Sequence, residues 1–144
     1  LSPEGELRLL VQDFVYPNGL CFSPDESLLY INDTRQNLIR VFEVQVDGSI
    51  ANGRLFAKLQ GTEPGRADGM KVDVHGNVYC TGPAGVHVFD ASGQQLGRIR
   101  TAHPTNLAFG GADLRTLFIT TQRTVVRIAM QVPGLPVYDT GSLA

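Results

Sequence analysis

Short runs of β-branched and aromatic residues, separated by turn residues, recur along the whole chain and limit the folds open to it. Residues 28–31, 38–44 and 116–120 are examples, and runs of this length and composition are typical of β-strands. Between them, turns such as residues 46–49 (VDGS) place glycine where a hairpin needs a positive φ. No window carries the apolar spacing of a long helix. The sequence therefore predicts an all-β protein whose consecutive strands are antiparallel.

The pattern of strands and turns repeats along the chain. The repeats begin at Asn18, Asp68 and Thr105, which are 50 and 37 residues apart. Antiparallel strands in repeats of this length are typical of β-propeller blades. The predicted units are the last strand of an upstream blade within residues 1–14 (at residues 6–11) and blades at residues 15–59, 67–100 and 104–138. Residues 1–144 thus form a partial β-propeller of about three four-stranded blades, and the outer strand of the third is not evident.

Three blades do not close a propeller, which needs roughly four to eight. An open ring would expose more apolar surface than a monomer tolerates. Two arrangements would complete a six-bladed ring. In the first, the chain is the C-terminal half of a longer polypeptide and needs the missing N-terminal half. In the second, two copies of the chain pair.

The composition excludes several classes of partner. The 12 Lys and Arg nearly balance the 14 Asp and Glu, so no strong field is available for nucleic acid. No apolar run approaches the ~18 residues of a membrane span, and no signal peptide is visible. The two cysteines, Cys21 and Cys80, lie in strand-like runs and are expected to be buried thiols. We therefore expect no nucleic acid, no membrane and a cytoplasmic location.

Two polar residues could form a metal site on the propeller axis. Asn18 and Asp68 occupy equivalent places at the start of successive repeats, where the first strand of a blade lines the central channel. Amide and carboxylate oxygens suit hard cations such as Ca²⁺, Mg²⁺ or Mn²⁺. The alternative is that Asn18-Gly19 and Asp68-Gly69 are only turns before a strand, because Asn-Gly and Asp-Gly are common turn pairs.

Several motifs resemble the second half of the SMP-30/gluconolactonase family, which includes regucalcin. They are residues 17–20 (PNGL) followed by 22–25 (FSPD), residues 67–73 (ADGMKVD) and residues 104–117 (PTNLAFGGADLRTL). The last is the most specific. Together the matches extend over residues 15–130 in the order and spacing of the family.

The resemblance implies a six-bladed propeller that hydrolyses a sugar lactone with one divalent cation on its axis. It implies that Asn18 and Asp68 are metal ligands and that Asp68 also acts as the general base. Ca²⁺ is the expected ion, with Zn²⁺, Mn²⁺ and Mg²⁺ as alternatives. A third family ligand, a glutamate near the N-terminus, has no counterpart here, since neither Glu4 nor Glu6 lies in a matching motif. The isolated chain is therefore expected to lack part of the site.

Three further residues are candidates for substrate contact. His103 precedes the entry strand of the third repeat, Arg66 lies in the loop before Asp68, and Asp33 ends a strand in the first repeat. His75 and His87 are assigned to the surface or to packing. No Gly-x-Ser-x-Gly motif is present, so an acyl-enzyme is not expected. The alternatives to a lactonase are a non-catalytic propeller scaffold that binds a ligand or protein and a half-propeller that forms a homodimer.

Overall fold

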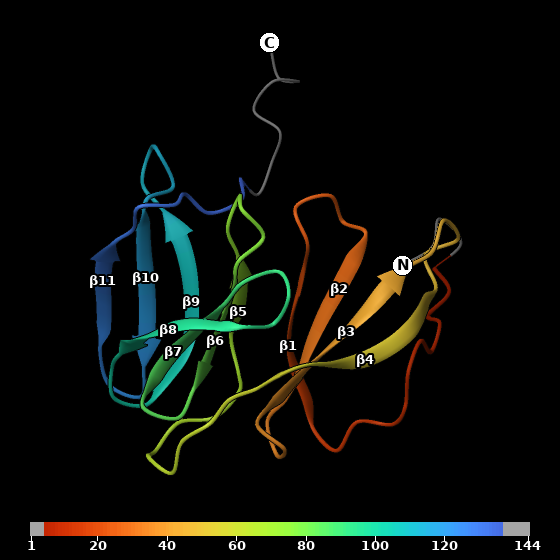
Figure 1. The fold of residues 1–144 in the computed structure, drawn as a ribbon, viewed down its shortest axis with the longest axis horizontal. Coiled ribbons are helices and arrows are strands. Elements are labelled where there is room, and N and C mark those ends of the chain that lie inside the picture. The colour runs from red at the N-terminus through yellow and green to blue at the C-terminus, as the bar shows by residue number, and fades with distance from the viewer. Residues whose placement is uncertain (1–4, 137–144) are drawn as a thin grey trace.

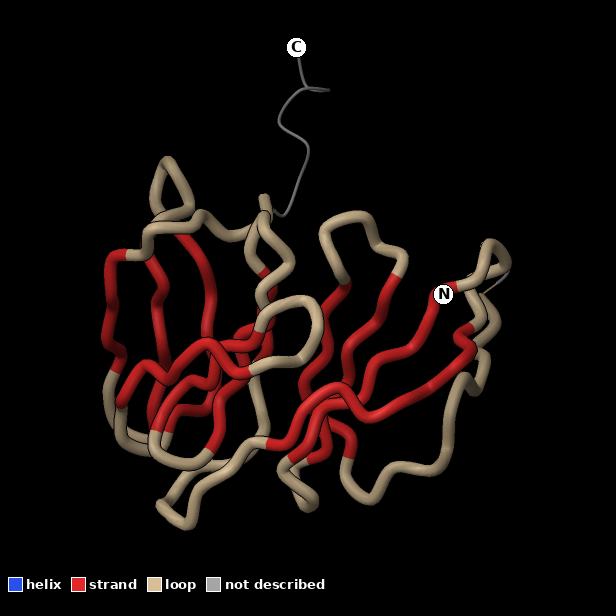
Figure 2. Tube along the Cα trace, in the orientation of Figure 1, coloured by secondary structure: helices blue, strands red, loops and turns tan. Residues whose placement is uncertain are grey.

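The computed structural model describes residues 5–136, and these contain strands and loops but no helix (Figures 1 and 2). Within these residues no segment is therefore a helix that could cross a bilayer. The strands are β1 (Pro17–Phe22), β2 (Leu28–Asp33), β3 (Leu38–Val44), β4 (Ile50–Lys58), β5 (Met70–Val72), β6 (Val78–Gly82), β7 (Gly85–Phe89), β8 (Gln95–Arg100), β9 (Pro104–Gly110), β10 (Thr116–Thr121) and β11 (Val125–Ala129). The prediction of an all-β protein is confirmed.

The strands form three antiparallel sheets, each made of consecutive strands. Their orders are β1-β2-β3-β4, β5-β6-β7-β8 and β9-β10-β11. In Figure 1 they lie side by side, from the first sheet on the right to the third on the left. The third sheet has three strands within the described residues, and residues 137 and 138 of the predicted blade lie outside them. Antiparallel sheets of three or four strands thus match the predicted repeats.

The first strands of the sheets are neighbours, since β1 contacts β5 and β5 contacts β9. Apolar clusters fill the two interfaces between sheets, which we call the first seam (sheets one and two) and the second seam (sheets two and three). In the first seam Tyr30 and Ile39 pack with Met70 and Phe89. In the second seam residues from both sheets form another cluster, namely Tyr79, Val86, Leu107, Leu117 and Ile119. The seams bring the starts of β1, β5 and β9 together.

The segment before β1 differs from the prediction. A strand was expected at residues 6–11, but the structure has no strand there, since none of the described strands pairs with it. Leu7 is 94% exposed, whereas Val11 and Phe14 pack against the outer face of the first sheet. The Arg40 guanidinium lies over the Phe14 ring, 4.7 Å from its centre, and contributes to this contact. The assignment of residues 6–11 to an upstream blade stays a prediction.

Candidate functional site

Asn18 and Asp68 come together at the first seam. Asn18 is the second residue of β1, and Asp68 lies two residues before β5. The Asn18 amide lies close enough to the Asp68 carboxyl to affect its pKa as a hydrogen-bond donor. Burial raises the pKa of Asp68 above its ordinary value, and the hydrogen bond from Asn18 opposes that rise. The two predicted oxygen donors are therefore direct neighbours.

The glycine after each of these residues allows the sheets to approach closely. A Cβ atom on Gly19 would overlap the backbone oxygen of Asp68. A Cβ atom on Gly69 would lie 2.6 Å from the Cα atom of Asn106 in the third sheet. Gly19 lies inside β1, Gly69 directly precedes β5, and neither has a positive φ. Asn18-Gly19 is therefore part of a strand rather than only a turn before one, and close packing explains both glycines.

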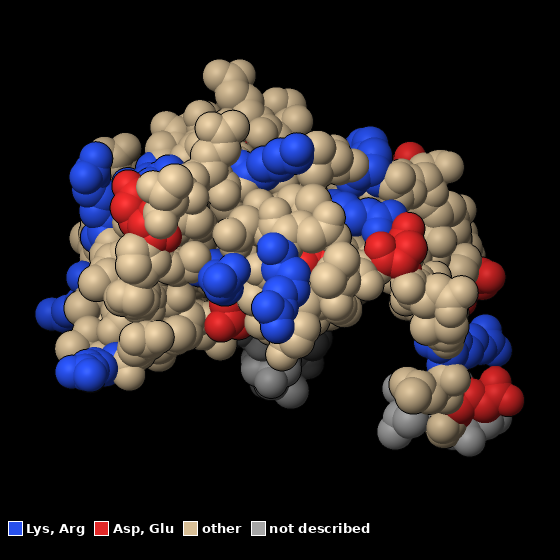
Figure 3. Space-filling model, turned by 90° about the horizontal axis from the view of Figure 1, so that it is seen from below, with Lys and Arg blue, Asp and Glu red and all other residues tan. Residues whose placement is uncertain are grey.

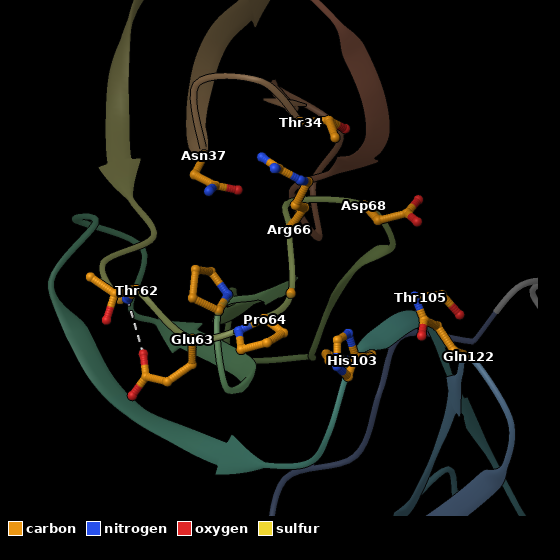
Figure 4. A pocket seen from close by; sticks show the side chains of 14 residues that line it. Thr34, Asn37, Thr62, Glu63, Pro64, Arg66, Asp68, His103, Thr105 and Gln122 are labelled. Carbon is orange, nitrogen blue, oxygen red and sulfur yellow. Dashed lines mark hydrogen bonds between the residues drawn. The ribbon is translucent and has the colours of Figure 1, made fainter.

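A cavity of about 560 Å³ opens beside Asp68, between loops that come from all three sheets (Figure 4). Arg66 and His103 line it together with Asp68, so three of the predicted site residues share one cavity. Asn18 and Asp33 are not among its lining residues. The sequence did not single out the polar lining residues Asn37 and Gln122. The only sequence signal for them is their position in loops beside the predicted strand ends.

Arg66 brings a positive charge to the cavity. Its side chain extends toward Asn37 and away from Asp68 (Figure 4). Its guanidinium has no hydrogen-bond or ion-pair partner among residues 5–136. Its backbone is held in place, because the Thr81 hydroxyl donates to the Arg66 carbonyl at 3.2 Å. A fixed backbone with a free cationic group is suited to bind a polar or anionic ligand.

His103 lines the cavity from the side of the third sheet, with a φ of 46°. A positive φ is uncommon for a residue with a side chain and indicates a constrained turn. The His103 carbonyl accepts a hydrogen bond from the Gln122 backbone at 3.3 Å. His87 instead is fully buried, with Nε2 3.0 Å from the Pro83 carbonyl, which agrees with a packing role.

Asp33 is placed differently from the other predicted site residues. It is fully buried, and Oδ2 accepts the backbone N–H groups of Val15 at 2.8 Å and Tyr16 at 3.1 Å. Oδ1 accepts the backbone N–H groups of Arg35 and Gln36. Burial acts to raise the pKa of Asp33, but these backbone hydrogen bonds outweigh it and lower the pKa to about 2. Its carboxylate thus anchors the chain before β1 and has no surface open to the cavity.

The two predicted ligand residues form a partial donor set that suits a hard divalent cation. Asn18 and Asp68 supply an amide and a carboxylate oxygen, which are ligand types that Ca²⁺ and Mg²⁺ prefer. In the part of the chain that the structure describes, no group of three or more His, Cys, Asp or Glu residues could hold an ion. Further ligands would have to be water, substrate or residues beyond those described.

The face that carries these loops, at the bottom of Figure 1, has charges of both signs. In Figure 3, acidic side chains on this face lie beside clusters of Lys and Arg. A ligand entering from this side therefore meets a mixed field rather than a continuous patch of one charge.

Comparisons with known proteins agree with the motifs. The model of the SMP-30/Gluconolactonase/LRE-like region matches residues 1–123. A gluconolactonase of Zymomonas mobilis is 33% identical over 93% of this chain and 40% of its own length. A solved gluconolactonase from Xanthomonas campestris has a TM-score of 0.75 and 34% identity, covering 94% of this chain and 43% of that one. The calcium-binding protein regucalcin from Agrobacterium tumefaciens, 24% identical, has a similar fold, with a TM-score of 0.78 over 92% of this chain and 52% of that one. The chain spans less than half of the two gluconolactonases.

Proposed function

The chain belongs to the SMP-30/gluconolactonase/LRE-like family, and on that premise we propose that it takes part in the hydrolysis of sugar lactones. The observation that carries the proposal is the contact between Asn18 and Asp68 beside a cavity bordered by all three sheets. Its similarity to gluconolactonases supports the same reaction class.

We propose that the chain works within a complete six-bladed ring. It spans only 40% of the Zymomonas gluconolactonase, so the remaining blades come from an N-terminal half or from a second copy. Apolar side chains at both ends of the row of sheets support this: Leu20 and Phe22 are exposed on β1, and Val126 and Ile128 on β11. Sedimentation of the purified chain distinguishes the two sources. A species of twice the chain mass supports pairing, and a monomer supports a missing half.

Asn18 and Asp68 would hold one divalent cation, for which Ca²⁺ is our first choice and Zn²⁺, Mn²⁺ and Mg²⁺ are the alternatives. Such a cation would polarise the lactone carbonyl and make the attacking water more acidic. Asp68 is the group in this chain that can take the water proton. When the ring C–O bond breaks, the proton returns to the departing ring oxygen, which becomes the hydroxyl of the product acid.

We propose Arg66 and His103 as substrate contacts, because both line the cavity beside Asp68. The Arg66 guanidinium can donate to hydroxyl or acidic groups of a sugar lactone. Asp33 was the third candidate, but its carboxylate is occupied by backbone donors. We therefore assign Asp33 to holding the start of β1.

The second candidate function is a non-catalytic scaffold that binds a ligand or protein through the same cavity. It is favoured by the two-residue donor set, because a site with two protein oxygens binds a cation weakly. Titration with Ca²⁺ and Mn²⁺ separates the functions. Tight binding by the complete ring supports the lactonase, and the absence of binding supports the scaffold.

The decisive test of the lactonase is the Asp68→Asn variant in the complete ring, assayed on glucono-1,5-lactone. We expect turnover to fall by at least about 100-fold, because the variant loses both a charged ligand and the proton acceptor. Asp113→Asn is the matched control, since Asp113 is exposed and its carboxylate accepts, within residues 5–136, only from the Arg115 backbone. Normal turnover in the Asp68→Asn variant would refute the mechanism.

A further inference from the structure

We propose that Asn32 and Thr34, at the end of β2 beside Asn18, are positioning residues that set the geometry of the cation ligands. Neither is proposed to touch the cation or the substrate. The inference rests on the proposed function, since it assigns a role to residues around the same site. It is carried by four hydrogen bonds, two made by Asn32 and two made by Thr34, and by the direction in which each one must run.

Asn32 links the backbones on which the two ligands sit. Its side chain has no exposed surface, and it lies at the first seam. Oδ1 accepts the Gly19 N–H at 3.1 Å, and Nδ2 donates to the Asp68 carbonyl at 2.7 Å. These groups belong to the peptide bonds that directly follow Asn18 and Asp68. One amide therefore fixes the spacing between the two ligand positions.

The environment of Asn32 leaves its amide no other arrangement. Nδ2 also lies 3.4 Å from the Cys80 sulfur, so both ends of the amide have partners inside the protein. A buried amide without partners would be strongly unfavourable. Rotation of the amide by 180° would set Nδ2 against the Gly19 N–H and Oδ1 against the Asp68 carbonyl, which pairs donor with donor and acceptor with acceptor. The Asn32 amide, which we call the polar clamp, is thus fixed in orientation as well as in place.

Thr34 fixes the orientation of the Asn18 amide. The Thr34 hydroxyl donates to the Ala67 carbonyl at 2.7 Å. A hydroxyl has one proton, so toward Asn18 the Thr34 oxygen can only accept. The contact of 3.2 Å between Thr34 Oγ1 and Asn18 must therefore involve Nδ2 of Asn18.

The consequence concerns which atom of Asn18 is free to bind a cation. With Nδ2 held by Thr34, Oδ1 points to the other side of the amide group. Hard cations bind the amide oxygen and are repelled by the NH₂ group. The Asp68 carboxylate is a second acceptor for the same amide, so without the Thr34 hydroxyl one of the two restraints on Nδ2 is lost. Thr34 therefore helps to keep Oδ1 available to a cation before one arrives.

The test is Ca²⁺ titration of the complete ring by calorimetry, comparing Thr34→Val with wild type. Valine keeps the shape of threonine and removes the hydroxyl, and we expect Ca²⁺ affinity to fall about tenfold or more, as is typical when a group that orients a metal ligand is lost. Thr34→Ser keeps the hydroxyl and is expected to bind within about threefold of wild type. Thr124→Val removes an exposed hydroxyl in the loop between β10 and β11 and serves as the control.

Each outcome decides between distinct claims. Unchanged Ca²⁺ affinity in Thr34→Val, or equal losses in Thr34→Val and Thr34→Ser, would overturn the positioning role while leaving the proposed function intact. A wild-type ring that binds none of Ca²⁺, Zn²⁺, Mn²⁺ and Mg²⁺ would overturn the proposed function and with it the role of these residues. If Thr34→Val does not fold, Thr34→Ala removes the hydroxyl without placing a methyl group beside the Ala67 carbonyl, and the same comparison applies.

Discussion

The first and second seams bring equivalent parts of neighbouring sheets together, but they are joined in different ways. In the first seam, the Asn32 side chain lies between β1 and the Asp68 carbonyl and bonds to both. In the second seam, the Gly69 N–H donates directly to the Thr105 carbonyl at 3.0 Å. Both seams require a glycine at the closest approach, Gly19 in one and Gly69 in the other.

Strand register shows that the difference is one of sequence rather than of fold. Leu20 pairs with Ile31 in the first sheet, and Met70 pairs with Cys80 in the second. Asn32 and Thr81 therefore hold equivalent positions. The Thr81 hydroxyl donates to the Arg66 carbonyl within its own repeat and does not reach the third sheet. The polar clamp is present at the seam that carries Asn18 and Asp68, which is why we connect it with function.

The largest expected effect tests the close packing at a glycine that both seams share. Gly19→Ala should lower the free energy of unfolding by at least about 3 kcal/mol, because the added methyl group meets a backbone carbonyl that cannot move aside. Gly69→Ala should be somewhat milder, because part of its clash is with the Asn106 side chain. Urea unfolding measures both. Gly97→Ala in β8 is the control, since nothing lies within 4 Å of its new methyl group.

The next largest effect tests the hydrogen bonds of Asn32, which have no equivalent at the second seam. Asn32→Leu should lower the free energy of unfolding by about 2 kcal/mol, because it leaves the Gly19 N–H and the Asp68 carbonyl buried without partners. Thr81→Val, at the equivalent place in the second sheet, should lower it by about 1 kcal/mol. Equal losses in urea unfolding would show that the first seam is not specially held, and would remove the contrast between the two seams.

The sequence predicted the features that depend on repetition. Strand and turn patterns located the three sheets, and the equivalent places of Asn18 and Asp68 correctly indicated that they would be neighbours. A repeat can be predicted because each copy repeats the same local pattern.

The roles of Asn32 and Thr34 could not be predicted, because their partners include backbone groups that only sheet packing brings close. Residues 32–34 (NDT) read as a strand end with a possible turn, and nothing local indicates that Asn32 reaches Asp68, 36 positions away. Residues 6–11 form no strand with the described sheets, because a strand requires a pairing neighbour, and their assignment to an upstream blade stays a prediction. Asn-Gly and Asp-Gly are common turn pairs, but here both glycines mark a close approach between sheets.

A pH experiment tests how the start of the first sheet is held. The pKa of Asp33 is lowered to about 2 in the folded protein, so its carboxylate stabilises the fold above its ordinary pKa near 4. This contribution is lost as the pH falls from about 4 to about 2. Asp33→Asn should therefore be less stable than wild type at pH 7 and show a shallower loss of stability between pH 4 and pH 2. Thermal unfolding at several pH values measures this, with Asp113→Asn as the control; parallel curves for Asp33→Asn and wild type would contradict it.

The smallest expected effect concerns which side of the cavity contacts the substrate, since both seams border the cavity. Arg66 enters it beside Asp68, and His103 enters from the third sheet. In the complete ring, Arg66→Gln should raise KM for glucono-1,5-lactone about fivefold with kcat nearly unchanged, because a free guanidinium contributes binding but no proton transfer. His103→Asn, chosen because asparagine tolerates the positive φ at this position, should raise KM about twofold. A larger rise in KM for His103→Asn than for Arg66→Gln would indicate that the substrate binds nearer the second seam. A drop in kcat for Arg66→Gln would mean that the guanidinium acts in the transition state rather than in binding alone.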